Sequence, residues 1–164
     1  MKLLISLTLV LLGLLLIALL LGGGALVLNR LPWSDAPGPM ARLAIYLSNN
    51  VAELRDDAVL PELRPRRYPV APEALFAALE RAVATLGWQV TDRQPASGEL
   101  TAVVTTPLLR FKDDVEMAVE PADEGGSLLQ ARAASRLGKA DFGTNTRHLL
   151  DLRAALEAEL AAVP

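Results

Sequence analysis

Two segments of this 164-residue sequence concentrate the side chains that could do chemistry. Residues 105–114 read TTPLLRFKDD, and residues 134–147 read ASRLGKADFGTNTR. Their cations, carboxylates and amides form a candidate polar cluster of Lys112, Asp113, Asp114, Arg136, Asp141, Asn145 and Arg147. Ion-pair networks of this composition commonly hold loops together. We therefore expect first that Lys112, Arg136 and Arg147 pair with the carboxylates and fix the two loops against each other.

Three chemical roles remain open as alternatives. Free N–H groups at the start of a helix attract anions, so an anion or lipid headgroup could bind near Arg136, Lys139, Asn145 and Arg147. Hard cations prefer oxygen ligands but usually need more of them than Asp113, Asp114 and Asp141 provide. A hydrolase or another enzyme would use the same carboxylates with His148 as acid or base, provided that they converge in a cleft.

Several catalytic signatures are absent from the sequence. Ser135 lacks the neighbourhood of an activated nucleophile. The sequence contains no glycine-rich phosphate loop, HExxH or GxSxG motif. It has a single histidine and no cysteine, which excludes thiolate chemistry and His-rich metal clusters. We therefore predict a non-catalytic protein with no catalytic residue, no metal and no cofactor.

The N-terminal segment predicts attachment to a membrane. From Leu3 to Leu21 it is apolar apart from Ser6 and Thr8, and Val27 and Leu28 end a second apolar run after three glycines. Nineteen residues at ~1.5 Å each nearly span a ~30 Å hydrocarbon core. A cleaved signal peptide is the alternative, but its apolar region is normally only ~7–15 residues. We therefore expect residues 1–30 to be an uncleaved single-pass anchor.

Charge bears on both orientation and partners. Lys2 precedes the apolar run, and a short N-terminal tail generally stays inside, so we expect the C-terminal domain outside the cytoplasm. Lys2 and Arg30 are the charged residues of 1–30, which leaves 14 basic against 19 acidic residues in the rest of the chain. This acidic balance argues against nucleic acid as a partner, because phosphate binding needs a basic face. The membrane bilayer remains as a partner, together with a possible protein partner or apolar ligand.

Residues 31–65 are expected to form a connecting region. Prolines and a glycine at 32–39 favour a non-helical segment. Trp33 could lie in the headgroup layer or in a loop. One helical stripe is indicated by the three- and four-residue spacing of Met40, Leu43, Leu47, Val51 and Leu54, although residues 43–47 could also alternate as a strand. We expect this stripe to pack on the domain.

The remaining residues, 66–164, carry the periodicity of one small domain. Pro72 suits the first turn of a helix and Gly87 the position beyond its end. Alternation and turn residues predict strands starting at 66, 88, 99, 114 and 127. In the strand 114–120, Val115, Met117 and Val119 share one face. A last helix starts near Thr144 or Asn145, either of which can cap it.

This pattern predicts an α+β fold. An N-terminal transmembrane helix precedes a small antiparallel sheet, whose apolar face needs two covering helices, in the order β-α-β-β-β-β-α. Small folds of the TATA-box-binding-protein-like and helix-grip classes share that pattern, which by itself assigns no function. Small residues at Ala102, Ala118, Ala131 and Ala133 could leave room for an apolar ligand between helices and sheet, or could let a helix approach closely.

The two polar segments resemble a bacterial and plastid family catalogued as domain of unknown function 1499. The resemblance rests on the Phe-Lys-Asp-Asp run at 111–114, the Ser-Arg-x-Gly-x-x-Asp-x-Gly-x-Asn run from Ser135 and the Arg67-Tyr68-Pro69 entry, and it covers roughly residues 43–160. It implies a small α+β domain, often behind a membrane or export segment, with no established activity. Many members have Asn-Cys-Val near the domain start, whereas this chain has Asn49-Asn50-Val51.

Each polar segment contains one large aromatic residue, Phe111 in the first and Phe142 in the second. Burying such a ring contributes ~1.5–3 kcal/mol, which is enough to order a loop. We therefore expect both rings to be largely buried plugs. Lys112, Asp113, Asp114, Arg136 and Asp141 would surround them as a paired cluster, because a lone buried charge is too costly.

Overall fold

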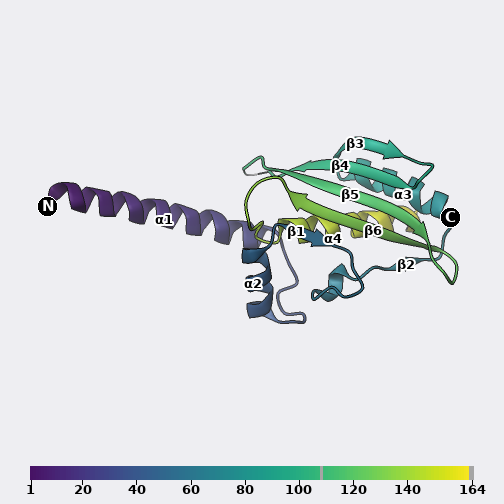
Figure 1. Ribbon diagram of the computed structural model, residues 1–164, viewed down its shortest axis with the longest axis horizontal. Helices are drawn as coiled ribbons and strands as arrows, with labels where there is room; N and C mark the ends of the chain where they lie inside the picture. The colour runs from purple at the N-terminus through teal and green to yellow at the C-terminus, as the bar shows by residue number, and fades with distance from the viewer. Residues whose placement is uncertain (108, 163–164) are drawn as a thin grey trace.

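The computed structural model describes residues 1–107 and 109–162. It begins with the long helix α1 (Lys2–Leu28), which continues through the three glycines at 22–24 and projects from the rest of the chain (Figure 1). Its 27 residues span about 40 Å at ~1.5 Å per residue. The mean hydropathy of its most apolar window is 3.0, and none of that window is buried within the protein. This helix is therefore long and apolar enough to cross a membrane.

The domain is built on one antiparallel sheet of six strands. The strands lie in the order β1-β6-β5-β4-β3, and β2 pairs beside β1 on β6. Their bounds are β1 (Val51–Glu53), β2 (Arg67–Tyr68), β3 (Gln89–Gln94), β4 (Glu99–Thr105), β5 (Lys112–Pro121) and β6 (Ser127–Ser135). The longest strands, β5 and β6, are neighbours in the middle of the sheet. The predicted α+β class with an N-terminal apolar helix is confirmed.

Two helices, α3 (Pro72–Thr85) and α4 (Thr144–Ala161), lie side by side on one face of this sheet (Figure 1). The inward positions of the strands meet them, and Val115, Met117 and Val119 are buried as their alternation predicts. Ala102 and Ala133 are fully buried beneath the helices. Their small side chains let the helices approach the sheet closely, which is one of the two roles expected for them.

The connecting region packs on the domain through a different face from the one predicted. It contains α2 (Pro39–Ser48) and the short 3₁₀ helix η1 (Pro61–Leu63). The predicted stripe is wrong, because the helix ends at Ser48 and the side chains of Met40, Leu47 and Val51 are exposed. Arg42 and Tyr46 are buried instead. Leu31, Tyr46, Leu54, Leu60 and Leu63 join the same apolar core as the sheet and its helices.

Arg42 explains why a charged face turns inward. Its guanidinium donates to both carboxylate oxygens of Glu62 at 2.5 and 2.9 Å, and to the Tyr46 hydroxyl at 3.1 Å. It also donates to the carbonyls of Asp35 and Ala36 at 3.0 and 2.6 Å. A buried charge is tolerated when it is paired and hydrogen-bonded in this way. Arg42 thereby ties the connecting region to the domain.

Candidate functional site

The two polar segments meet at the end of the sheet from which α1 leaves. Thr105 on β4 pairs with Lys112 on β5, and Asp113 on β5 pairs with Ser135 on β6. The loops that follow β4 and β6 therefore start at the same end of the sheet. The Arg136 N–H donates to the Lys112 carbonyl at 3.1 Å and connects them.

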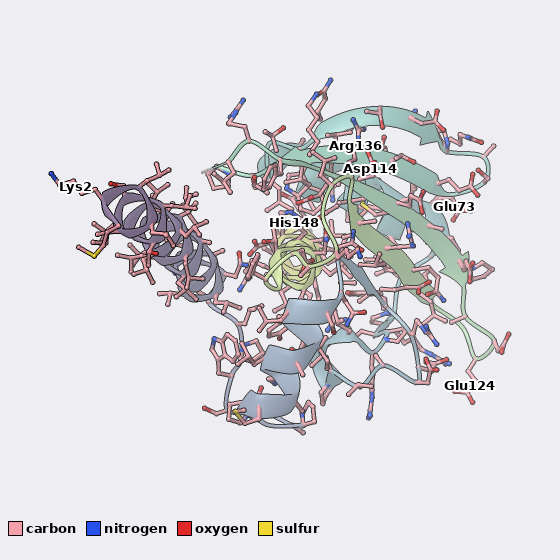
Figure 2. The ribbon with its side chains drawn as sticks, turned by 60° about the vertical axis from the view of Figure 1, so that its left-hand side comes forward. Lys2, Glu73, Asp114, Glu124, Arg136 and His148 are labelled. Atoms are coloured by element: carbon pink, nitrogen blue, oxygen red, sulfur yellow. The ribbon has the colours of Figure 1, made fainter. Side chains whose placement is uncertain are left out.

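Strand alternation separates the two adjacent aspartates of this site. Successive side chains of a strand point to opposite faces, so Asp113 points toward the helices and is buried, whereas Asp114 lies on the solvent side. There Arg136 donates to both Asp114 carboxylate oxygens at 2.6 and 2.9 Å (Figure 2). The guanidinium holds the pKa of Asp114 below its usual value. The expected pairing of these two residues is present, but on the outer face.

On the inner face, α4 places two polar side chains against the sheet. Asn145 and His148 are three residues apart and thus share one helix face. His148 Nε2 lies 2.9 Å from Asp113 Oδ2, and the Trp88 ring meets the imidazole edge to face, with centroids 5.9 Å apart. Asn145 donates through Nδ2 to the Ser135 hydroxyl at 2.9 Å. Two cross-layer hydrogen bonds therefore hold the start of α4 on β5 and β6.

Two oxygens of this inner group have no hydrogen-bond partner among the described residues. They are Oδ1 of Asp113 and Oδ1 of Asn145, and both atoms are buried. Asp113 is 1% exposed and His148 9%, so the pair lies below the surface rather than in an open cleft. The groups that could act as acid and base are adjacent, but they are covered by α4 and the sheet.

Asp141 caps the N-terminus of α4. Its Oδ1 accepts the Gly143 N–H at 2.8 Å, and its Oδ2 accepts the Asn145 N–H at 2.9 Å. These are free donors of a helix start, which a carboxylate stabilises. Burial raises the pKa of Asp141 in spite of these hydrogen bonds, which lower it. The helix begins at Thr144 as predicted, but the capping side chain is Asp141 and not Thr144 or Asn145.

Gly143 allows the chain to enter α4 at this point. Its φ of 79° lies in the left-handed region that favours glycine. A Cβ atom there would lie 2.3 Å from Leu31 Cδ1, which is a clash. It would also lie 3.1 Å from the Tyr46 ring, which is a tight contact. The preceding Phe142 lies partly buried beside α1, where its ring is 3.0 Å from the position that a Cβ of Gly22 would occupy. The loop therefore packs closely on both the connecting region and α1.

The remaining predicted site residues lie apart from this group. Lys112 is exposed and forms no ion pair with a described residue. Arg147 pairs with Asp151 one turn later on α4 and with none of the three predicted carboxylates. The polar residues thus do not form one network but an outer pair, an inner group and a helix cap. Strand alternation and the helix start assign each carboxylate a different environment.

Phe111 is not the buried plug that we predicted, since it is 47% exposed. The loop is closed instead by Thr106, whose hydroxyl accepts the Phe111 N–H at 2.9 Å and whose N–H donates to the Phe111 carbonyl at 2.8 Å. These hydrogen bonds join Thr106 to Phe111 without burial of the ring. Phe142 is partly buried, so only one ring packs inside.

Sequence reasoning missed Asn50 and Trp88 at the inner group. The Asn50 carbonyl accepts from Asn145 Nδ2 at 2.8 Å, and the Asn50 side chain donates to the Gly138 carbonyl at 2.7 Å. Trp88 borders His148 at the start of β3. No local spacing signals these contacts, because Asn50 and Asn145 are 95 residues apart. The Asn50 contacts arise only when β1 pairs with β6.

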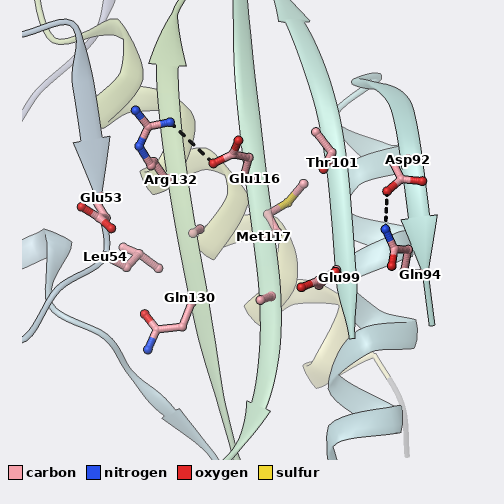
Figure 3. A pocket seen from close by; sticks show the side chains of 12 residues that line it. Glu53, Leu54, Asp92, Gln94, Glu99, Thr101, Glu116, Met117, Gln130 and Arg132 are labelled. Carbon is pink, nitrogen blue, oxygen red and sulfur yellow. Dashed lines mark hydrogen bonds and ion pairs between the residues drawn. The ribbon is translucent and has the colours of Figure 1, made fainter. Parts of the chain in front are cut away.

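The sheet also carries an open hollow of about 470 Å³ on the face opposite the helices (Figure 3). Polar side chains line most of it, including Glu53, Asp92, Glu99, Glu116 and Arg132. Arg132 lies 3.5 Å from Glu116, whose negative charge it partly offsets. Among the described residues, no group of three or more His, Cys, Asp or Glu side chains could hold a metal ion. The hollow is an acidic surface and lies away from the buried His148.

These features define a class of protein in which one apolar N-terminal helix leads into an α+β domain with both its helices on one face of the sheet. The chain belongs to the family described as Protein of unknown function (DUF1499), whose model matches residues 45–156. The match runs from α2 to α4 and includes both polar loops and the inner group. A search of curated proteins found no match.

Proposed function

We propose that this chain is a single-pass membrane protein whose domain is a non-catalytic accessory module. It acts by binding a protein partner or lipid at the membrane surface. The observation that carries the proposal is the contact between α1 and the domain. Asn29, directly after α1, donates to the Phe142 carbonyl at 2.9 Å and to the Thr144 hydroxyl at 3.1 Å. Leu26 packs against the domain core.

This contact supports the proposal that the domain is held close to the bilayer and is not separated from it by a long flexible linker. A flexible linker would let the domain sample many distances from the membrane. Here Leu31, two residues after Asn29, is buried in the domain core. The apolar helix α1 therefore packs against the domain core. This arrangement suits a protein that binds other molecules at the membrane surface.

The environment of each carboxylate supports a non-catalytic role. Asp114 is neutralised by Arg136, Asp141 accepts two backbone N–H groups, and Asp113 is buried against His148. A general acid or base must reach the proton that it transfers. These three carboxylates face different directions and do not border one common cleft.

One observation favours the alternative, a hydrolase or another enzyme. His148 and Asp113 are hydrogen-bonded at 2.9 Å, an arrangement that can orient an imidazole as a general base. Catalysis would require α4 to move away from β5 and expose the pair. His148→Gln is the discriminating variant, since it keeps a donor toward Asp113 but has no titratable group. We expect it to preserve the function of the chain in cells, and loss of function at unchanged stability would favour the enzyme.

Membrane insertion is tested by alkaline carbonate extraction of membranes that contain the full chain. We expect the chain to stay in the pellet, and a variant with Leu11→Arg and Leu15→Arg to be released. Both side chains are exposed on α1, so this change spares the domain core. Release of the unmodified chain by carbonate would contradict the proposal.

Orientation needs a separate experiment. We propose that the domain lies on the extracytoplasmic side, on the basis of Lys2 before the apolar run. A reporter fused after the C-terminus, of a kind that is active only outside the cytoplasm, should be active. Activity of a strictly cytoplasmic reporter at the same position would reverse the orientation and leave the anchoring unaffected.

A further inference from the structure

Among the described residues of the two loops at the end of the domain that α1 contacts, three large apolar side chains are exposed. Leu109 is 48% exposed and Phe111 47% in the loop after β4, and Leu137 is 69% exposed in the loop after β6. Exposed apolar side chains that gather on loop tips are unfavourable in water and mark an interaction surface. In the first loop, hydrogen bonds join Thr106 to Phe111, so the exposed Phe111 ring extends from a backbone position that is fixed to β4.

Exposed cations flank these apolar side chains. Arg110, Lys112 and Lys139 lie on the same two loops, and none forms an ion pair with a described residue. The nearby carboxylates do not offset them. Asp113 is buried and bonded to His148, Asp114 pairs with Arg136, and Asp141 caps α4. This end is therefore basic in a chain whose formal net charge is −3.

The loop at the opposite end of the sheet carries carboxylates instead of cations. The loop between β5 and β6 carries the exposed Asp123. It also carries the exposed Glu124 (Figure 2), which pairs with Arg67 at 2.9 Å. Its backbone is ordered by hydrogen bonds between Ala122 and Gly126 at 3.1 Å and between Gly125 and Ala122 at 2.9 Å. The loops near α1 thus carry unpaired cations, whereas the loop between β5 and β6 carries only carboxylates, one of which is paired with Arg67. Electrostatics would turn the basic end toward an anionic membrane surface.

The loops lie beside the part of α1 where the uninterrupted apolar run ends. Phe142 contacts Gly22, which directly follows that run, and its carbonyl accepts from Asn29. The loop after β6 is thus level with the point where a spanning helix would leave the hydrocarbon. The loop after β4 is connected to it through the hydrogen bond from Arg136 to Lys112. Figure 1 shows both loops at the end of the domain that adjoins α1.

We propose that these loops form a docking surface for the anionic headgroup layer of the bilayer that α1 crosses. The loop surface consists of Leu109, Arg110, Phe111, Lys112, Leu137 and Lys139. Its apolar side chains enter the headgroup region, and its cations contact lipid phosphates, as in other interfacial segments. This inference rests on the proposed function, because the bilayer is the one in which α1 is anchored.

The absence of cysteine allows the surface to be mapped with single labels. The full chain carrying Leu137→Cys is labelled with a polarity-sensitive dye and placed in nanodiscs in which one lipid in three is phosphatidylglycerol. Nitroxide at the lipid headgroup then quenches any dye that reaches this layer. Asp123→Cys at the opposite end is the matched control. We expect a blue shift and strong quenching at position 137, and neither effect at position 123.

Charge variants test the anionic preference. Arg110→Gln with Lys139→Gln removes two cations, each worth roughly a fivefold change in membrane affinity, so the ratio of docked to undocked domain should fall roughly 25-fold. Arg66→Gln with Arg67→Gln is the control, because these side chains pair with Glu157 and Glu124 away from the loops. In this control the dye at position 137 should be quenched as strongly as in the unmodified chain. In nanodiscs of phosphatidylcholine alone, the quenching at position 137 should be weaker.

The outcomes separate this inference from the proposed function. Equal dye spectra at positions 137 and 123, in a chain that stays with the nanodisc, overturn the loop surface and leave the anchor intact. Quenching at 137 that is unchanged in phosphatidylcholine and in the Arg110 and Lys139 variant overturns the anionic headgroup as ligand. A chain that separates from the nanodisc overturns both proposals.

Discussion

Replacement of Asp141 by alanine should destabilise the domain, because this carboxylate caps α4. Asp141→Ala removes the acceptors of the Gly143 and Asn145 N–H groups, which lie at 2.8 and 2.9 Å. Hydrogen bonds to charged groups contribute ~1.5–3 kcal/mol, and loss of an N-terminal cap costs ~0.5–2 kcal/mol. The carboxylate is partly buried, and the desolvation that raises its pKa offsets part of this gain. We therefore expect the free energy of unfolding to fall by about 2 kcal/mol.

Asp141→Asn is the matched variant. The amide keeps one oxygen that can accept one of the two N–H groups, and it carries no charge that must be desolvated. We expect Asp141→Asn to lower the free energy of unfolding by about 1 kcal/mol, which is half of the effect of alanine. Urea unfolding of the full chain in detergent, followed by circular dichroism, measures both changes.

The pH dependence gives a second test with a defined sign. The pKa of Asp141 is raised above its ordinary value of 3.8, so the folded state binds the proton more tightly than the unfolded state does. This stabilising contribution is complete below pH 3.8 and is lost as the pH rises through the folded pKa. The stability of the unmodified chain relative to Asp141→Asn should therefore decrease as the pH rises from 3.8 through the pKa of Asp141 in the folded state.

Two results would refute this reasoning. If Asp141→Ala unfolds at the same urea concentration as the unmodified chain, the two hydrogen bonds contribute no net stability. If the stability of the unmodified chain relative to Asp141→Asn increases with pH, burial does not control the pKa of the Asp141 carboxyl group. A variant that keeps its stability but no longer associates with lipid in the nanodisc assay would instead identify Asp141 as a binding residue.

Three further predictions concern the other buried or paired charges. Arg42→Met should lower the free energy of unfolding by about 3–5 kcal/mol, because it leaves the partner carboxylate unpaired, and a urea titration measures the loss. His148→Phe should cost about 3 kcal/mol by the same measurement, because the buried Asp113 carboxylate loses its partner, whereas glutamine at 148 should cost less. Arg136→Gln should return the pKa of Asp114 toward 3.8 in a carboxyl NMR titration. In the unmodified chain the stabilisation from this pair is present at neutral pH and is lost as the pH falls through the lowered pKa of Asp114.

Local sequence patterns predicted the central strands well, because their side chains alternate between core and solvent. The alternation of Val115, Met117 and Val119 is the clearest case. The same period, continued two residues toward the N-terminus, places Asp113 on the inner face. We expected the strand to start at Asp114, and it starts at Lys112. An adjacent pair of aspartates reads locally as a polar turn, although the strand continues through it.

The connecting region shows what local patterns could not provide. The apolar spacing in α2 predicted the wrong face, because the buried face depends on Arg42 and its partner Glu62, which are 20 residues apart. The same limit applies to Asn50 and Asn145, which meet only after β1 has paired with β6. Ion pairs and amide contacts between distant segments have no period that a single sequence displays.

The start of α4 couples α1 to the interior of the domain. Asp141 fixes the turn at 141–145, and in that turn Phe142 contacts Gly22 and accepts a hydrogen bond from Asn29. The next turn of α4 carries His148, which reaches Asp113 beneath the sheet. Loss of the Asp141 cap should therefore loosen both the inner group and the contact with α1. It follows that Asp141→Ala should also reduce headgroup quenching at position 137. A variant with both Arg136→Gln and Asp114→Asn removes the outer ion pair without changing the net charge of the loops, so it should leave that quenching largely unchanged.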